Sequence, residues 1–271
     1  MDEGEEIEGL LDEAEAALEA GRAQLALALG REAAGLDPDC LDALLIQADA
    51  LLELGDCGGA EPLYRRLEEL APDEPAVLAG RGLCLFELTR FEAAEQVLRL
   101  ALELDSRLAE VHQCLGLLLE RDGREAEAER RFARARALAP EDYRPPVELA
   151  EQRFDACIEA ALLDLPPPVA EALADVSVVV EQLPADEDLR AAEPPLSPRI
   201  LGLWRGSPLS ERSVFDPWTE LPGGIVLYQR NLQRFARDEA DLIDQIRITV
   251  MHEVGHALGL DEAQIEQRGW S

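Results

Sequence analysis

Residues 75–106 read PAVLAGRGLCLFELTRFEAAEQVLRLALELDS, and the pattern within them recurs along the first half of the chain every 34 residues. The period is set by the positions that end successive units, namely Pro38, Pro72, Ser106 and Pro140. Three columns of mostly small residues keep the same spacing: Ala14, Ala48, Gly82 and Gly116; Ala26, Ala60, Ala94 and Ala128; Ala33, Leu67, Ala101 and Ala135. Small side chains at a fixed period are expected where helices approach closely, so the pattern predicts stacked helix pairs.

Glycine marks the turn inside each unit, at Gly21, Gly55 and Gly123, and Thr89 replaces it in the third unit. A helix-turn-helix unit of this length with these columns resembles the tetratricopeptide repeat, and the resemblance covers about residues 7–142. The first unit is the weakest match because Gly30 stands where a large apolar residue is usual, as expected of a terminal cap. The sequence therefore predicts an all-α solenoid of about four repeats over residues 1–142.

The resemblance implies that the array binds a peptide or a partner protein in a groove. One well-known version of the repeat grips a C-terminal carboxylate with lysine and asparagine. Neither residue occurs in residues 1–142, so that class of partner is not expected.

A second domain is predicted over residues 147–271, after the helix-breaking stretch Tyr143-Arg144-Pro145-Pro146. Helices are expected at 147–163 and 238–260, with a short helix after Pro166. Strands are expected at 176–180, 200–204 and 225–228, the first of them buried, with a polar loop over 206–222. Three strands with flanking helices indicate a small α+β domain.

The last long helix carries the sequence His252-Glu253-Val254-Gly255-His256. Residues four apart share one face of a helix, so both imidazoles point to the same side, opposite an apolar stripe that includes Ile246, Val250 and Leu258. Two neutral imidazole nitrogens about 2 Å from one ion are typical of a zinc site. Glu253 follows the first histidine and can reach a water on the metal, which is the position of a general base.

Zinc needs a third protein ligand, and the remaining histidine, His112, lies in the repeat array. Gly259 ends the helix and allows the chain to turn back toward the histidines, so an acidic residue beyond it is expected to complete the site. Glu262 is narrowly favoured, Asp261 is the alternative, and Glu266 is a distant third.

The stretches Ile200–Leu209, Ile225–Tyr228 and Arg247–Glu262 resemble the minimal zincin family of bacteria, over about residues 147–271. The resemblance implies a short sheet over the motif helix and zinc-dependent peptide hydrolysis. Within the resemblance, Glu262 falls at the position where metzincin-type peptidases have their last metal ligand. No methionine follows Met251, so the Met-turn of full metzincins is absent, and an acidic third ligand lowers the Lewis acidity of the metal.

The leading hypothesis is a zinc metallopeptidase in which Glu253 is the catalytic base and the repeats recruit the substrate or a partner protein. The strand at 225–228 is a candidate edge for substrate pairing, and Tyr228 and Arg205 are candidates for lesser roles, each with a structural role as the simpler interpretation. The alternative is a non-enzymatic adaptor with a structural or regulatory metal site.

The formal net charge is −32 over 271 residues, and every basic residue is arginine. Such an acidic surface repels phosphate backbones and anionic lipid, so neither a nucleic acid nor a membrane is expected as a partner. The five cysteines form no C-x-x-C pair and are expected to be reduced, and the N-terminal residues do not resemble a signal peptide. A cytoplasmic location is therefore expected.

Overall fold

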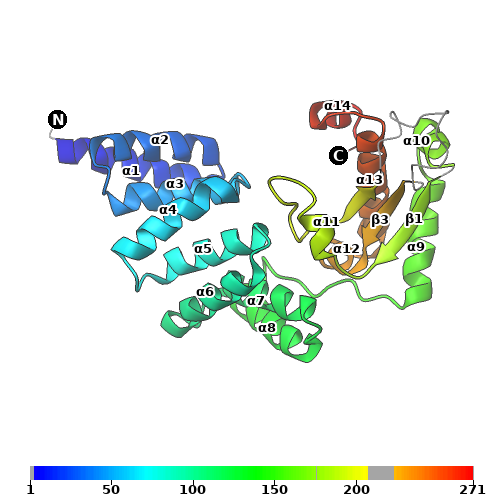
Figure 1. The fold of residues 1–271 in the computed structure, drawn as a ribbon, viewed down its shortest axis with the longest axis horizontal. Helices are drawn as coiled ribbons and strands as arrows, with labels where there is room; N and C mark the ends of the chain where they lie inside the picture. Colours follow the sequence, from blue (N-terminus) through cyan, green and yellow to red (C-terminus); the bar gives the residue numbers. More distant parts are fainter. Residues whose placement is uncertain (1–2, 175, 207–222, 271) are drawn as a thin grey trace. The chain divides into compact units, whose positions relative to one another are not determined.

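The structure of the chain, a computed structural model, describes residues 3–174, 176–206 and 223–270. It divides into two units (Figure 1). The first comprises Met1–Tyr143 with Asp186–Ser197, and the second comprises Arg144–Ala185 with Pro198–Ser271. The segment 186–197 therefore joins the first unit although it lies far along the chain, and nothing in its own sequence indicated this.

The first unit contains successive antiparallel helix pairs with the predicted period. Their bounds are α1 Glu3–Glu19, α2 Ala23–Leu36, α3 Leu41–Glu53, α4 Cys57–Leu70, α5 Pro75–Glu87, α6 Phe91–Leu104, α7 Ala109–Arg121 and α8 Glu125–Leu138. The predicted turn glycines have left-handed φ values of 67°, 78° and 71° at Gly21, Gly55 and Gly123. Thr89 adopts the same conformation with φ 57°, so the turn geometry is kept where glycine is missing.

Close helix contact explains the columns of small residues. A Cβ added to Gly82 would lie 2.5 Å from Leu98 Cδ2, and one added to Gly116 would lie 2.4 Å from Phe132 Cε1. The alanines of the second column are between 0% and 2% exposed. Larger apolar residues such as Tyr64 and Leu98 fill the space between the pairs.

The segment 186–197 contains the short helix α11, Asp186–Leu189, and is held to the array by arginine side chains. Arg121 Nη2 donates to Asp186 Oδ1 at 2.5 Å, and the Arg121 guanidinium lies 4.4 Å from the centre of the Phe91 ring. From the segment itself, Arg190 Nη2 donates to the carbonyl oxygen of Thr89, in the turn between α5 and α6, at 3.0 Å.

The second unit consists of short helices around a small sheet, as the predicted α+β class requires. Its helices are α9 Glu151–Leu163, α10 Pro167–Ala172, α12 Gln229–Phe235, α13 Glu239–Ala257 and α14 Glu262–Gln267, and its strands are β1 Ser177–Glu181, β2 Gly202–Arg205 and β3 Gly224–Tyr228. The strand order is β1-β3-β2; β1 pairs with β3 in parallel and β2 with β3 antiparallel. The predicted loop at 206–222 lies, beyond Gly206, outside the described residues.

Two details of the predicted sheet were wrong. The strand at 225–228 was a candidate edge, but β3 is the central strand, because both of its sides are already paired within the described sheet. The strand at 176–180 was predicted to be buried, yet Val179 is 43% exposed and Val180 is 37% exposed. The β3 side chains instead fill the core, where Ile225 and Leu227 are fully buried.

Helix α13 lies in the core of the second unit and fixes the orientation of the predicted site. Asp238 caps its N-terminus by accepting from the backbone N–H of Asp241 at 2.9 Å. Its apolar stripe includes Ile246, Val250 and Val254, which are fully buried, each stabilising the fold by about 1.5–3 kcal/mol. Leu258 was assigned to this stripe but is 38% exposed, because it lies past the last helical residue.

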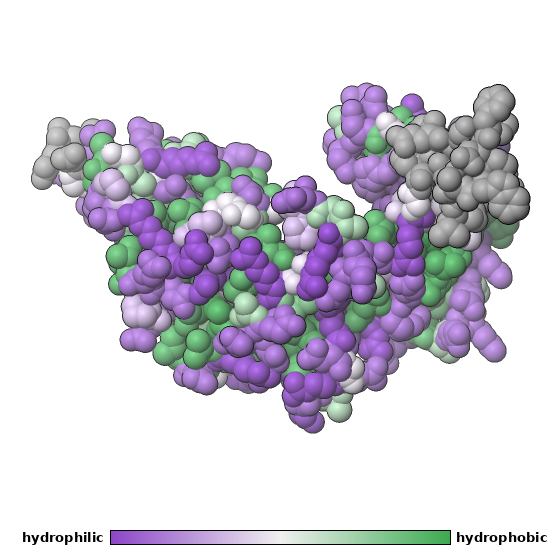
Figure 2. Space-filling model, viewed as in Figure 1, coloured by the Kyte–Doolittle hydropathy of each residue, from purple (hydrophilic) through white to green (hydrophobic). Residues whose placement is uncertain are grey.

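The visible surface is mainly hydrophilic, in keeping with the composition of the chain (Figure 2). None of the five cysteines, all of which lie in the described residues, forms a disulfide, and four of them are buried. None of the helices in the described part of the chain has the length and apolar character that spanning a bilayer requires.

Candidate metal centre

The two motif histidines lie in the last turns of α13 and face each other. The Nε2 atoms of His252 and His256 are 3.0 Å apart, and the ring planes meet at 82°. The side chains are 28% and 36% exposed, respectively, so the nitrogens lie at the surface of the second unit and not in its core. The helix geometry that the sequence predicted therefore places both donor atoms on one side.

The chain reverses immediately after the histidines because α13 ends in a glycine cap. Gly259 has a φ of 79°. Its N–H donates to the carbonyl oxygen of His256 at 2.9 Å, and the N–H of Leu260 donates to the carbonyl oxygen of Gly255 at 3.0 Å. This bond pair is the Schellman motif, which needs a residue with positive φ at the glycine position. The reversal starts α14 beside the histidines.

Glu262, the first residue of α14, completes a group of three ligand-type side chains with His252 and His256. Its carboxylate oxygens lie 3.2 Å from His256 Nε2 and 3.8 Å from His252 Nε2. Ligand atoms about 2.0–2.2 Å from a tetrahedral zinc lie roughly 3.3–3.6 Å apart, so the three observed separations fit such an ion with small adjustments. Glu262 is 73% exposed, which leaves the group accessible to a further ligand.

Asp261, the alternative third ligand, has a different role in the structure. Its side chain accepts from the backbone N–H of Gln264 at 2.9 Å, while the Gln264 side chain accepts from the backbone N–H of Asp261, so the two form a capping box. Neither Asp261 nor Glu266 belongs to the group formed by the histidines. His112 lies in the first unit, where its Nε2 bonds to the carbonyl of Ser106 at 3.1 Å.

Glu253 points from α13 toward the sheet. Its Oε2 accepts from the backbone N–H of Trp204, in β2, at 2.6 Å, and the residue is only 9% exposed. Burial raises the pKa of the Glu253 carboxyl, and the hydrogen bond from Trp204 opposes that rise. The sequence did not predict the contact with Trp204, because the donor is a backbone N–H, which every residue except proline has.

The two residues with suggested lesser roles occupy structural positions. Tyr228 ends β3 and is fully buried in the core. Arg205 ends β2 and donates to both carboxylate oxygens of Glu181, in β1, at 2.8 and 3.2 Å.

Two histidines of a helix and an acidic residue after its glycine cap define a zincin-type arrangement on a small α+β fold. Residues 173–270 match the family model described as zincin-like metallopeptidase, and residues 11–75 and 45–109 match that of the tetratricopeptide repeat. The chain thus combines tetratricopeptide repeats with a zincin-like domain, as its sequence indicated.

Among solved structures, two similar ones illustrate the comparison. MamA from Desulfovibrio magneticus RS-1 has 22% sequence identity and a TM-score of 0.44; the match covers 49% of this chain and 75% of that chain. TTC0263, a thermophilic TPR protein from Thermus thermophilus, has 24% identity and a TM-score of 0.45, with 62% and 90% covered. No curated protein matches this chain.

Proposed function

We propose that this protein is a zinc-dependent peptidase whose repeat array binds the substrate or a partner protein. The observation that carries the proposal is the convergence of His252, His256 and Glu262 on one point beside the buried carboxylate of Glu253. Two imidazoles and one carboxylate are a donor set that suits zinc and leaves one of its four positions open. The match of this region to a metallopeptidase family supports the same class of reaction.

Each residue then has a definite task. Zinc held by His252, His256 and Glu262 would supply Lewis acidity and lower the pKa of a coordinated water. Glu253 would accept the proton of that water and return it to the leaving amine. Because its Oε2 already accepts the N–H of Trp204, Oε1 is the atom assigned to the proton. A pKa raised by burial suits this task, since a base works best when its pKa approaches the working pH.

The alternative function is an adaptor in which the metal site stabilises the fold or regulates binding. The contact between Glu253 and Trp204 favours it, because this hydrogen bond ties the motif helix to β2 without any reaction. The two functions differ in what they require of the Glu253 carboxylate. An adaptor needs only a hydrogen-bond acceptor there, whereas a peptidase needs a base.

Glu253→Gln tests the proposal, because glutamine still accepts the Trp204 N–H but cannot take up the proton. We expect the variant to retain about one zinc per chain by elemental analysis. Cleavage of a peptide library should fall by about a hundredfold or more, to the level of the chelated wild-type protein. Glu266→Gln is the matched control, with the same change on an exposed glutamate of α14, and should cleave normally.

A wild-type protein that holds zinc but cleaves no peptide, and that Glu253→Gln leaves unchanged in every assay, would support the adaptor. A purified protein with no zinc would exclude both functions.

A further inference from the structure

A second candidate site lies in the repeat array, between the second helices of two successive repeats. It is a pocket of about 410 Å³ with α6 and α8 as walls and one face of α7 as the floor. The residues that line it are Glu95, Arg99, His112, Leu115, Leu119, Arg124, Glu127, Arg130, Arg131 and Arg134. Its leucines are buried, and its arginines reach it from α6, from α8 and from the turn before α8.

The charge of this pocket is opposite to that of the chain. Five arginines face two glutamates, which gives the lining a formal charge of +3, whereas the whole chain carries −32. One fifth of the 25 basic residues thus gather around one pocket, although acidic residues outnumber them more than twofold along the chain. A positive pocket surrounded by negative surface selects small or segmental anions, because long polyanions are repelled by the rest of the molecule.

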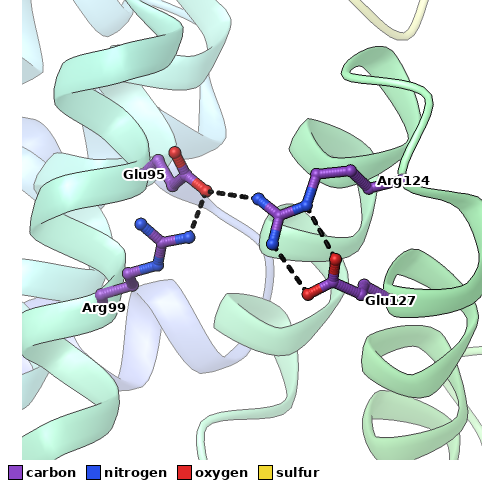
Figure 3. Close-up of polar contacts among 4 residues, drawn as sticks. All are labelled: Glu95, Arg99, Arg124 and Glu127. Atoms are coloured by element: carbon purple, nitrogen blue, oxygen red, sulfur yellow. Dashed lines mark hydrogen bonds and ion pairs between the residues drawn. The ribbon is translucent and has the colours of Figure 1, made fainter.

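Part of the pocket already shows how its arginines bind carboxylates (Figure 3). Arg124 donates from Nε and Nη2 to the two oxygens of Glu127 at 2.8 and 2.7 Å, in the bidentate geometry that matches a guanidinium to a carboxylate. Arg99 donates to Glu95 Oε1 at 2.5 Å, and Arg124 Nη1 lies 3.9 Å from the same oxygen. The two glutamates therefore form their hydrogen bonds with Arg99 and Arg124, and Glu127 also interacts electrostatically with Arg130.

The remaining three arginines differ from Arg99 and Arg124 in having no direct ion pair within the described part of the array. Among the described residues, no carboxylate lies within ion-pair distance of Arg130, Arg131 or Arg134. Arg131 Nη1 instead lies 3.2 Å from Nδ1 of the buried His112, whose Nε2 bonds to the carbonyl of Ser106. With the ring proton on Nε2, Nδ1 accepts from Arg131 and holds its guanidinium at the pocket. Burial lowers the pKa of His112, and Arg131 and Arg134 lower it further, which keeps this acceptor neutral.

We propose that this pocket binds an acidic peptide segment of a partner protein, with Arg130, Arg131 and Arg134 as the residues that bind its carboxylates. Guanidinium groups match carboxylates in geometry as well as charge, as Arg124 and Glu127 demonstrate within the pocket. Leu115 and Leu119 on the floor add apolar contact for the stems of the bound side chains. The volume accommodates a few side chains, which fits a short segment.

This inference rests on the part of the proposed function that assigns partner binding to the repeats, and it is independent of the zinc chemistry. It can be tested on the full-length protein with a fluorescein-labelled peptide in which glutamate alternates with alanine, followed by fluorescence anisotropy. A second peptide with glutamine at each glutamate position measures the contribution of charge. A single-stranded oligonucleotide of equal charge measures polyanion binding.

The pocket variant is the triple substitution Arg130→Gln, Arg131→Gln and Arg134→Gln. Its matched control is Arg22→Gln, Arg31→Gln and Arg107→Gln, which removes the same charge from exposed positions elsewhere in the array. We expect the pocket variant to bind the acidic peptide about tenfold or more weakly, and the control to change binding less than about twofold. Circular dichroism melting establishes that both variants are folded.

Three outcomes of these comparisons would overturn the inference: equal weakening by both triple variants, equal affinity for the glutamine peptide, or tighter binding of the oligonucleotide than of the acidic peptide. Zinc content and turnover, measured on the same preparations, keep the two proposals apart. The pocket variant should retain zinc, and Glu253→Gln should bind the acidic peptide normally. If the wild-type protein does not bind the acidic peptide, the inference is contradicted and the peptidase proposal is unaffected.

Discussion

At the scale of the residue, two neighbouring carboxylates beside the proposed metal site have different surroundings. Glu262 lies within 3.8 Å of both histidine Nε2 atoms, whereas the side chain of Asp261 caps α14. A carboxylate that accepts a backbone N–H at a helix N-terminus has one oxygen already bound. The structure therefore favours Glu262 as the third ligand in the proposed site.

We predict that Glu262→Ala weakens zinc binding by about a hundredfold or more, since it removes one of the three proposed protein ligands. Asp261→Asn should retain wild-type affinity, because asparagine is an equally good N-cap. Competition with a chromophoric chelator measures both affinities. If Asp261→Asn loses zinc and Glu262→Ala does not, the ligand assignment is reversed.

At the scale of the element, the position of α14 depends on a glycine of the motif itself. A Cβ added to Gly255 would lie 2.8 Å from Cγ1 and 2.9 Å from Cδ1 of Ile265, which is fully buried in α14. The absence of a side chain at 255 thus lets α14 pack against α13, and this packing brings Glu262 to the histidines.

Gly255→Ala should therefore weaken zinc binding several-fold by displacing α14, and it should destabilise the fold by about 1–3 kcal/mol. Chelator competition and urea unfolding of the zinc-free protein measure the two effects separately. A loss of stability at unchanged zinc affinity would mean that the position of α14 does not control the site.

The repeat array offers a matched pair of glycines that tests the packing interpretation of the small columns. Gly116→Ala should destabilise the protein by about 1–3 kcal/mol, since its Cβ would meet the Phe132 ring at 2.4 Å and push α7 from α8. Gly35→Ala, in α2, should instead be neutral or stabilising by up to about 1 kcal/mol, because no atom lies within 4 Å and alanine favours helix. Urea unfolding followed by circular dichroism distinguishes the two. If both substitutions change the free energy of unfolding by a similar amount, close helix contact is not the reason for the column of small residues that contains Gly116.

At the scale of the whole molecule, carboxyl groups with shifted pKa values make stability depend on pH. Burial raises the pKa of Asp49, partly buried in α3, and burial together with Asp49 raises that of Glu110, in α7. For groups with a raised pKa in the folded state, the stabilising contribution is complete below the unfolded pKa and is lost as pH rises through the folded pKa. Asp241 acts in the opposite sense: Arg237 lowers its pKa to about 2, so its contribution is lost as pH falls below 3.8 toward that value.

We therefore predict that the stability of the zinc-free protein falls as pH rises from about 4.5 toward 8, and that it also falls below about pH 4. Asp49→Asn should reduce the difference, because asparagine still accepts the Tyr64 hydroxyl bond but carries no charge. Thermal melting across this range in a constant ionic strength provides the measurement. A melting temperature that does not rise as pH falls from about 8 to about 4.5 would show that these partly buried carboxyls do not control stability.

The sequence by itself determined the features that depend on local periodicity. The recurrence every 34 residues predicted the helix pairs and their turns, including the turn where Thr89 replaces glycine. The spacing of His252 and His256 predicted that both imidazoles share one face, because helical geometry alone decides this. The classes of both regions followed from these patterns and are confirmed by the family matches.

Only the tertiary structure decided which distant residues meet. It made β3 the central strand, left Val179 and Val180 of β1 exposed, and placed the segment 186–197 with the array. It also joined Glu253 to Trp204 and gathered arginines from separate helices into one pocket. The physical reason is that hydrophobicity and helix propensity act between near neighbours in the chain, whereas strand order, coverage of a face and local charge depend on residues that folding brings together.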